Sequence, residues 1–232
     1  MKILATSDLH GNLDQLDLSG VDVAVIAGDV APLKGRGPWH IYDQVKWMRT
    51  KFADFCKKWS SVKIVFTPGN HDFFPLAREK FGNTVLSGKN LSLELPDNCT
   101  MLIDQECEVC GLKIYGTPWV PIISHSWAFE AEHDVLEEKF SKIPKGLDIL
   151  VTHSPPRFNF VDVSLFYGVD SDRFGSHELA DAIFVKEPKF MFCGHIHTGS
   201  HDMNKLGKTE VYNVSRLDEG YSIAYQPCMV EI

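Results

Sequence analysis

The 232-residue sequence carries a formal net charge of -8, with 31 acidic and 23 basic residues, and 44% of its residues are hydrophobic. The acidic balance argues against a protein whose main task is stable nucleic-acid binding, because that affinity comes from lysines and arginines facing phosphates. No stretch approaches the roughly 20 apolar residues that cross a membrane, and the N-terminal apolar run is too short for a secretion signal. We expect a cytoplasmic protein with reduced cysteines and a single domain over residues 1–232.

Five short apolar runs, each ending at polar residues, predict the buried strands of a layered α/β sheet. They are residues 2–6, 21–27, 62–66, 149–151 and 190–193. Between the second and third runs, apolar residues recur at steps of three and four, which predicts an amphipathic helix. These residues are Ile41, Val45, Met48, Phe52, Phe55 and Trp59. A weaker helix is predicted over residues 178–183, with Ser176 as its N-cap and Pro188 beyond its end.

Runs rich in β-forming residues, separated only by turns, predict hairpins over residues 100–115 and 210–225. Two long irregular stretches remain, residues 118–133 and 155–175, and loops of this length are often functional. The aromatic residues of the second loop either stack on a nucleobase or anchor the loop as a hydrophobic plug. They are Phe158, Phe160, Phe166, Tyr167 and Phe174. Arg157 and Arg173 of this loop either bind a substrate phosphate or are simply solvated.

Each of the five apolar runs is followed directly by side chains that bind metals. The clusters are Asp8-Leu9-His10, Gly28-Asp29, Gly69-Asn70-His71-Asp72, Thr152-His153 and Gly194-His195-Ile196-His197. A single aspartate at a strand end is usually a turn residue, and a single histidine is usually only hydrogen-bonded. Five such strand ends together favour a shared site, because ligands collect beyond the carboxyl ends of strands in open α/β sheets.

Carboxylate and imidazole ligands suit Mn²⁺, Zn²⁺ or Fe²⁺ better than Ca²⁺, which prefers oxygen alone. Seven candidate ligands are too many for one ion, whereas two ions about 3.5–4 Å apart share a carboxylate. Gly28, Gly69 and Gly194 directly precede ligands, where the absence of a Cβ lets backbones crowd around the centre. Cys107 and Cys110 have C-x-x-C spacing, but no second pair follows and a strand points them to opposite faces, so we do not expect a zinc site there.

The ordered motifs D-x-H, G-D, G-N-H-D, an isolated H and G-H-x-H, from Asp8 to His197, resemble the calcineurin-like metallophosphoesterase superfamily. Within it, residues 115–119, 127–129, 143–156 and 194–197 resemble the metallophosphoesterase-domain-containing (MPPED) branch, near the class III cyclic nucleotide phosphodiesterases. The resemblance implies an α/β fold, a four-layer α/β/β/α sandwich of two mixed sheets flanked by helices.

The resemblance also implies a dinuclear site. One metal ion is held by Asp8, His10, Asp29 and His197, and the other by Asp29, Asn70, His153 and His195, so that Asp29 is the bridge. His71 is implied to face the substrate and either protonate the leaving oxygen or stabilise the charge of the phosphate, and Asp72 to orient His71. We expect two divalent ions, with Mn²⁺ as the first choice and Fe, Zn, Ni or Co as alternatives.

The expected reaction is hydrolysis of a phosphoester by a metal-bridging hydroxide that attacks phosphorus in line. A small phosphodiester, nucleotides included, is the substrate that the MPPED resemblance implies. A phosphomonoesterase and a nuclease of the same fold remain alternatives, and the acidic charge counts against the nuclease. A non-catalytic, metal-binding scaffold for protein assembly is a further alternative, against which the retained His71 argues. The sequence leaves open the substrate, the native metals, the oligomeric state and the role of the 155–175 loop.

Overall fold

Two mixed β-sheets packed face to face form the centre of the computed structural model, which describes residues 1–164 and 173–232. In the first sheet the strands lie in the order β13 (Cys228–Glu231), β1 (Lys2–Thr6), β2 (Val23–Ala27), β3 (Lys63–Thr67) and β4 (Cys99–Met101). In the second the order is β11 (Asn204–Leu206), β12 (Thr209–Asn213), β10 (Phe190–Cys193), β9 (Ile149–Thr152), β6 (Leu112–Thr117) and β5 (Gln105–Val109). All five strands predicted from apolar runs are present.

Alternate side chains of these strands serve two different cores. Ile3 of β1 points between the sheets, where it joins Val65 and Phe192, while its neighbour Leu4 points toward the helices of the first sheet. A strand that is buried on both faces must be apolar at nearly every position. This explains why the strand runs of the sequence are continuous rather than alternating.

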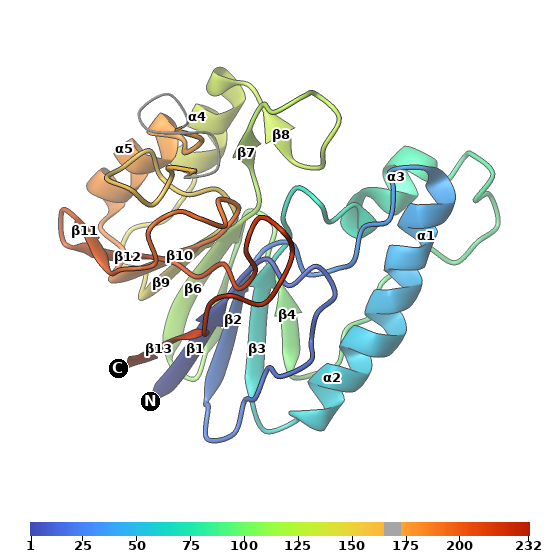
Figure 1. Cartoon of the computed structure of the whole chain (residues 1–232), viewed down its shortest axis with the longest axis horizontal. Helices are drawn as coiled ribbons and strands as arrows, with labels where there is room; N and C mark the ends of the chain where they lie inside the picture. Colours follow the sequence, from blue (N-terminus) through green and yellow to red (C-terminus); the bar gives the residue numbers. More distant parts are fainter. Residues whose placement is uncertain (165–172) are drawn as a thin grey trace.

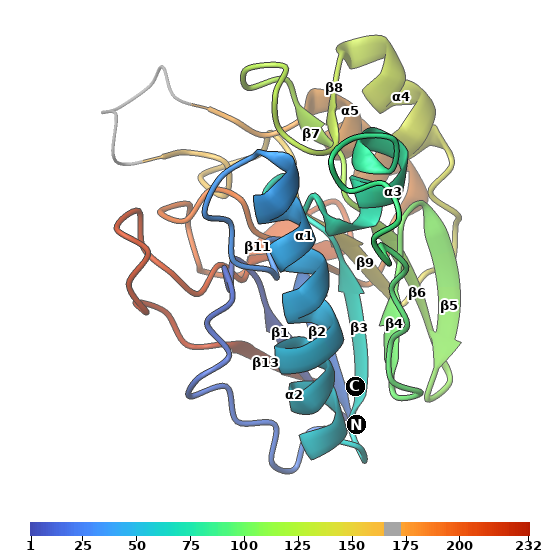
Figure 2. The ribbon, with the colours of Figure 1, turned by 90° about the vertical axis from the view of Figure 1, so that its right-hand side faces the viewer.

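A single long helical segment covers the outer face of the first sheet (Figures 1 and 2). It consists of α1 (Pro38–Trp47), a π-helical turn (Met48–Phe52) and α2 (Ala53–Lys58). The predicted apolar stripe is its buried side, with Ile41, Met48 and Phe52 fully buried. A short 3₁₀ turn (Phe74–Leu76) and α3 (Ala77–Phe81) lie beside it.

Two further helices, α4 (His133–Ser141) and α5 (His177–Lys186), cover the second sheet (Figure 1). Leu136 and Leu179 from these helices pack with Leu150 and Met191 of the strands. The predicted cap is confirmed, since the Ser176 hydroxyl accepts a hydrogen bond of 3.1 Å from the Leu179 N–H. Helices on the outside of two packed sheets confirm the predicted four-layer α/β/β/α sandwich.

The hairpin predicted over residues 100–115 is confirmed by antiparallel pairing of β5 with β6, whereas within 210–225 the antiparallel pairing is limited to one bridge between Leu217 and Ile223. Strand β12 pairs instead with β11, which precedes it, through a turn at Gly207 that adopts a φ of 61°. After β12 the chain crosses to the first sheet, where Ser215 bridges Ser7. The loop predicted over 118–133 also contains two short strands, β7 (Val120–Pro121) and β8 (Glu130–Ala131).

Cys107 and Cys110 are free thiols and belong to no group of metal-binding side chains among the described residues. In the part of the chain that the structure describes, no helix combines the length and the apolar character needed to cross a membrane.

Candidate metal centre

The seven predicted ligands meet at one end of the two sheets. Strands β1, β2 and β3 run parallel to one another, as do β9 and β10, so their carboxyl ends lie at a common edge. Backbone hydrogen bonds join the segments that leave the strands: the His10 N–H donates to the Asp29 carbonyl oxygen at 2.8 Å, and the Gly194 N–H to that of His153 at 3.1 Å. The sequence clusters are thereby brought into one site.

A first group consists of Asp8, His10 and His197, whose ligand atoms all lie within 4.8 Å of one another. The Nε2 atom of His197 is 3.3 Å from Oδ1 of Asp8. On its other side, the His197 ring donates a hydrogen bond of 2.9 Å from Nδ1 to the carbonyl oxygen of Asp218. This bond fixes the ring and leaves Nε2 directed at the centre, as in histidines that bind metals.

A second group is organised around Asn70. Its Oδ1 lies 2.9 Å from Nε2 of His153 and 3.0 Å from Nδ1 of His195. The His153 ring donates from Nδ1 to the carbonyl oxygen of Ala27 at 2.9 Å, which again directs Nε2 inward. Asp29 lies between the two groups, with Oδ1 at 3.4 Å from His153 Nε2 and Oδ2 at 3.6 Å from His10 Nε2.

The buried charges of the centre fit a bound cation. The carboxylates of Asp8 and Asp29 are 0% and 2% exposed, and buried negative charges need a positive partner. The Nε2 atom of His10 is also buried and has no hydrogen-bond partner among the described residues. An orphaned nitrogen facing a buried carboxylate is explained if both are ligands, because the donor set is then the mixture of nitrogen and oxygen that divalent transition metals accept.

In the metal-free protein, protonated histidines partly balance the negative charge of the buried carboxylates. Burial acts against protonation of His153, but the carboxylate of Asp29 outweighs it and raises the pKa of His153 to about 9. His197 behaves in the same way beside Asp8, and its pKa is also raised to about 9. Burial dominates for His10 and lowers its pKa to about 4. Two imidazoles of the centre are therefore protonated at neutral pH and must lose their protons before they bind a metal.

Four of the seven predicted ligands adopt a left-handed backbone, with φ of 53° at Asp8, 44° at His10, 51° at Asp29 and 71° at His195. This region costs about 1–2 kcal/mol per non-glycine residue, although aspartate tolerates it better than most. Residues in such conformations cluster at functional sites, where surrounding contacts hold them.

The predicted role of the three glycines agrees with the packing. A Cβ on Gly28 would collide with the His153 ring, and one on Gly69 with the Asp29 carboxylate. At Gly194 it would collide with Asp8. Each glycine therefore admits a candidate ligand into the space that its own side chain would fill.

His71 lies beside the centre. Its Nε2 is 4.0 Å from Oδ2 of Asp29, and its ring stacks on Trp127 with 4.4 Å between centroids. A ligand atom of His71 also lies within 4.8 Å of those of His10 and Asp29, so proximity alone does not separate a proton donor from a ligand. The variants His71→Ala and Asn70→Ala distinguish a proton donor from a metal ligand, because only loss of a ligand lowers metal content.

Asp72 does not orient His71 in the way that the sequence suggested. Its carboxylate accepts hydrogen bonds of 2.9 Å from the backbone N–H groups of Val30, Ala31 and Gly69. Burial and the charge of Asp29 raise its pKa to about 7, against the effect of these three bonds. Asp72 thus fastens the loop that carries His71 to the loop after β2. None of these hydrogen bonds reaches the His71 imidazole, so any orientation of His71 by Asp72 acts through the backbone of this loop.

Comparison with known proteins supports this geometry. Residues 1–199 match the family model described as calcineurin-like phosphoesterase. The chain belongs to this family. The Caenorhabditis elegans UPF0046 protein C25E10.12 is 32% identical over 176 residues, which cover 73% of this chain and 61% of that protein. The human metallophosphoesterase domain-containing protein 1 is 28% identical over an alignment that covers 100% of this chain and 71% of the human one. These relatives confirm the MPPED branch, and the chain spans about three fifths of the worm protein's length.

Solved structures share the fold of this phosphoesterase. The protein TT1561 of Thermus thermophilus superimposes with a TM-score of 0.57 at 17% identity, covering 91% of this chain and 88% of that one. A phosphopantetheinyl hydrolase from Mycobacterium tuberculosis gives a TM-score of 0.52 at 14% identity, with 92% and 88% covered. The family uses divalent metals, and the clustered ligands of this phosphoesterase are suited to hold them.

Two hollows adjoin the candidate metal centre of this chain. The first, of about 410 Å³, is lined by His10 and His71 and by Trp127 and Tyr221, two aromatic residues that the sequence motifs did not identify as site residues. The ring of Tyr221 meets that of His10 edge-on at 4.7 Å between centroids. Trp127 lies in the long 118–133 loop, and the length of that loop was the signal that pointed to it.

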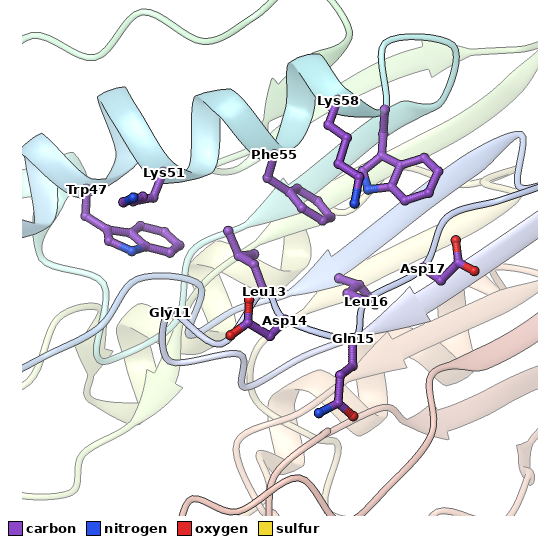
Figure 3. A pocket seen from close by; sticks show the side chains of 11 residues that line it. Gly11, Leu13, Asp14, Gln15, Leu16, Asp17, Trp47, Lys51, Phe55 and Lys58 are labelled. Atoms are coloured by element: carbon purple, nitrogen blue, oxygen red, sulfur yellow. The ribbon is translucent and has the colours of Figure 1, made fainter.

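The second hollow, of about 260 Å³, is lined by His195, Arg157 and Phe174, so the 155–175 loop does reach the site. Phe160 of that loop is 71% exposed, which makes the plug interpretation wrong for this residue. Phe166 and Tyr167 lie outside the described residues. A larger hollow of about 790 Å³, between residues 11–17 and the α1–α2 segment, is lined by none of the seven predicted ligands (Figure 3).

Proposed function

We propose that this phosphoesterase hydrolyses a small phosphodiester, nucleotides included, with two divalent metal ions, Mn²⁺ being the first candidate. The observation that carries the proposal is the position of Asp29 between two ligand groups. In the proposed arrangement Asp8, His10, Asp29 and His197 hold one ion, and Asp29, Asn70, His153 and His195 hold the other. When bound, such ions lower the pKa of a water molecule and offset the negative charge of the phosphoryl group.

Residues of the chain itself supply the remaining chemistry. His71 faces the first hollow, and its imidazolium donates a proton to the leaving oxygen in the proposed reaction. Its position is held from two sides, because Trp127 stacks on the ring and Gln44 donates a hydrogen bond of 2.8 Å from Nε2 to its backbone carbonyl oxygen. Hydrogen bonds from His153 and His197 to backbone carbonyl oxygens hold those imidazoles in the orientation that metal binding requires.

The preference for a diester is supported by the two hollows. A phosphodiester carries a substituent on each side of phosphorus, whereas a monoester carries one. One hollow adjoins His10 and His71, and the other adjoins His195, so the site has space for a substituent at each end. As part of the same proposal, we place the chain in the cytoplasm, because its six free cysteines suit a reducing compartment. We also propose that it forms a single domain.

The test is hydrolysis of bis(p-nitrophenyl) phosphate and p-nitrophenyl phosphate by protein that has been stripped of metal and reloaded. We expect no activity after chelation, recovery with Mn²⁺, up to two ions per chain by elemental analysis, and faster cleavage of the diester. Full activity of verified metal-free protein would remove the mechanism. The reverse ranking of the substrates would indicate a monoesterase, and inactivity towards both, with two ions bound, would favour a scaffold.

A further inference from the structure

The hollow beside His71 has a local excess of positive charge. Lys34 and Arg36 line it, and none of the described residues that line it is an aspartate or glutamate. This contrasts with the net charge of -8 of the whole chain. It also contrasts with the larger hollow of Figure 3, where two lysines are balanced by Asp14 and Asp17.

The two cations are not engaged by acidic side chains of the described chain. Among residues 1–164 and 173–232, no carboxylate oxygen lies within 4.0 Å of the charged nitrogens of Lys34 or Arg36. Arg36 donates one hydrogen bond from Nη1 to the Ser126 hydroxyl, and its guanidinium lies 4.4 Å from the centroid of the Trp127 ring. A guanidinium has five N–H donors in a planar fork, so donors remain for an oxyanion.

The position of this charge relates it to one part of the substrate. Arg36 lies over Trp127, and Trp127 stacks on His71, so the cation is two aromatic contacts from the proton donor. His71 donates to the leaving oxygen in the function proposed above, on which this step rests. The alcohol or phenol that departs from phosphorus must therefore occupy the hollow that Lys34 and Arg36 line.

We propose that the leaving group of the natural substrate carries its own anionic group, a carboxylate or a phosphate, which binds to Lys34 and Arg36 beside the indole of Trp127. In the reaction, the bond between phosphorus and the leaving oxygen breaks, water supplies the hydroxyl group that phosphorus gains, and the leaving oxygen receives a proton. The second anion is not cleaved. It adds charge-assisted hydrogen bonds that a neutral leaving group lacks.

Matched synthetic diesters test this assignment. Methyl 3-carboxyphenyl phosphate and methyl 3-carbamoylphenyl phosphate have leaving groups of almost the same shape, one anionic and one neutral. We expect Mn²⁺-loaded protein to prefer the carboxylate by about tenfold in kcat/KM, mainly through KM, and the preference to shrink as salt screens the charges. Methyl 3-phosphonophenyl phosphate, compared in the same assay, shows whether a carboxylate or a phosphate-like group is the better ligand.

Variants identify the residues that bind the anion. Arg36→Gln and Lys34→Gln should each lower the carboxylate-to-carboxamide ratio about threefold, and the double variant should bring it close to one, because exposed charges contribute less than buried ones. Arg49→Gln and Lys46→Gln are the matched controls, since both residues lie on the α1–α2 segment and line a different hollow. These controls should keep the wild-type ratio.

The outcomes separate this inference from the function on which it rests. Hydrolysis of both diesters with a ratio near one in the wild type overturns the anionic leaving group and leaves the phosphodiesterase standing. Failure to hydrolyse any diester in the presence of bound metal overturns both. A preference for the carboxylate that survives in the double variant would assign the anion to other residues and reject this site.

Discussion

Removing the His71 side chain should separate catalysis from metal binding. The ring accepts or donates no hydrogen bond within the described residues. It stacks on Trp127, meets His10 edge-on at 4.8 Å between centroids, and makes a looser, tilted contact with Tyr221 at 6.5 Å. Close aromatic contacts contribute about 0.5–1.5 kcal/mol each. At about 2–4 °C per kcal/mol for a chain of this size, loss of the two closer contacts in His71→Ala should lower Tm by about 2–12 °C.

The effect on turnover should be much larger. A general acid contributes about 10²–10⁴ to the rate, which is roughly 2.7–5.4 kcal/mol of transition-state stabilisation. The assay compares kcat for a methyl p-nitrophenyl diester with kcat for a dialkyl diester, and measures metal content by elemental analysis. The loss should be smaller for p-nitrophenolate, which departs with little protonation, and metal content should be unchanged.

Asn70→Ala is the matched neighbour. Its loss removes the oxygen that accepts from the imidazole rings of His153 and His195, so metal content should fall together with activity. The reasoning is refuted if His71→Ala empties a metal site, because His71 would then be a ligand. It is also refuted if that variant turns over the dialkyl diester at the wild-type rate.

Gly69→Ala places a methyl group against the proposed bridging carboxylate of Asp29 and should weaken metal binding at least tenfold. Gly37→Ala is the control: its Cβ would meet nothing nearer than 4.0 Å, so metal binding should be unchanged. A metal affinity of Gly69→Ala equal to that of the wild type would contradict the inference that Gly69 makes room for a metal ligand. Asp72→Asn replaces an acceptor with a donor that faces backbone N–H groups, so urea denaturation should show a loss of about 1–3 kcal/mol in the free energy of unfolding. Unchanged stability with reduced kcat would restore a direct role at the imidazole. Because the pKa values of His153 and His197 are raised from 6.5 to about 9, metal affinity should increase with pH and level off above about pH 9. The raised pKa values also stabilise the metal-free fold: this contribution is fully present below pH 6.5 and is lost as pH rises through about 9. Calorimetry in buffers of different ionisation enthalpy should detect proton release when metal binds. A metal affinity that does not change with pH would contradict the raised pKa values.

The candidate ligands could be predicted from the sequence because they directly follow buried strands. Apolar runs locate such strands, and parallel strands bring their carboxyl ends to one edge, so Asp8, Asp29 and Asn70 are expected to be neighbours without knowledge of the loops. The same reasoning located the helix of the first sheet, whose stripe has helical spacing. It missed α4, because Leu136 and Phe140 are the only buried residues of that nine-residue helix and are too few to give a clear period.

Residues that reach the site from loops could not be predicted in this way. Tyr221 lies in a turn in which its own backbone N–H donates to the Asp218 carbonyl oxygen at 2.9 Å. The periodic spacing of apolar residues does not predict the path of such a turn. For the same reason, the hairpin predicted over residues 210–225 is present only as the bridge between Leu217 and Ile223, while β12 pairs with β11. Asp72 was expected to orient His71, and the order of residues along the chain does not reveal that its carboxylate faces the backbone of another loop.

The left-handed backbone of Asp8, His10, Asp29 and His195 links the lifetime of the protein to its metal supply. At about 1 kcal/mol each, these four residues subtract about 4 kcal/mol from the folded state, a large part of the roughly 5–15 kcal/mol typical of native proteins. Bound metal restores stability in proportion to the logarithm of its concentration relative to Kd. If the centre binds metal as proposed, chains that lack it should open more often and be more exposed to proteases.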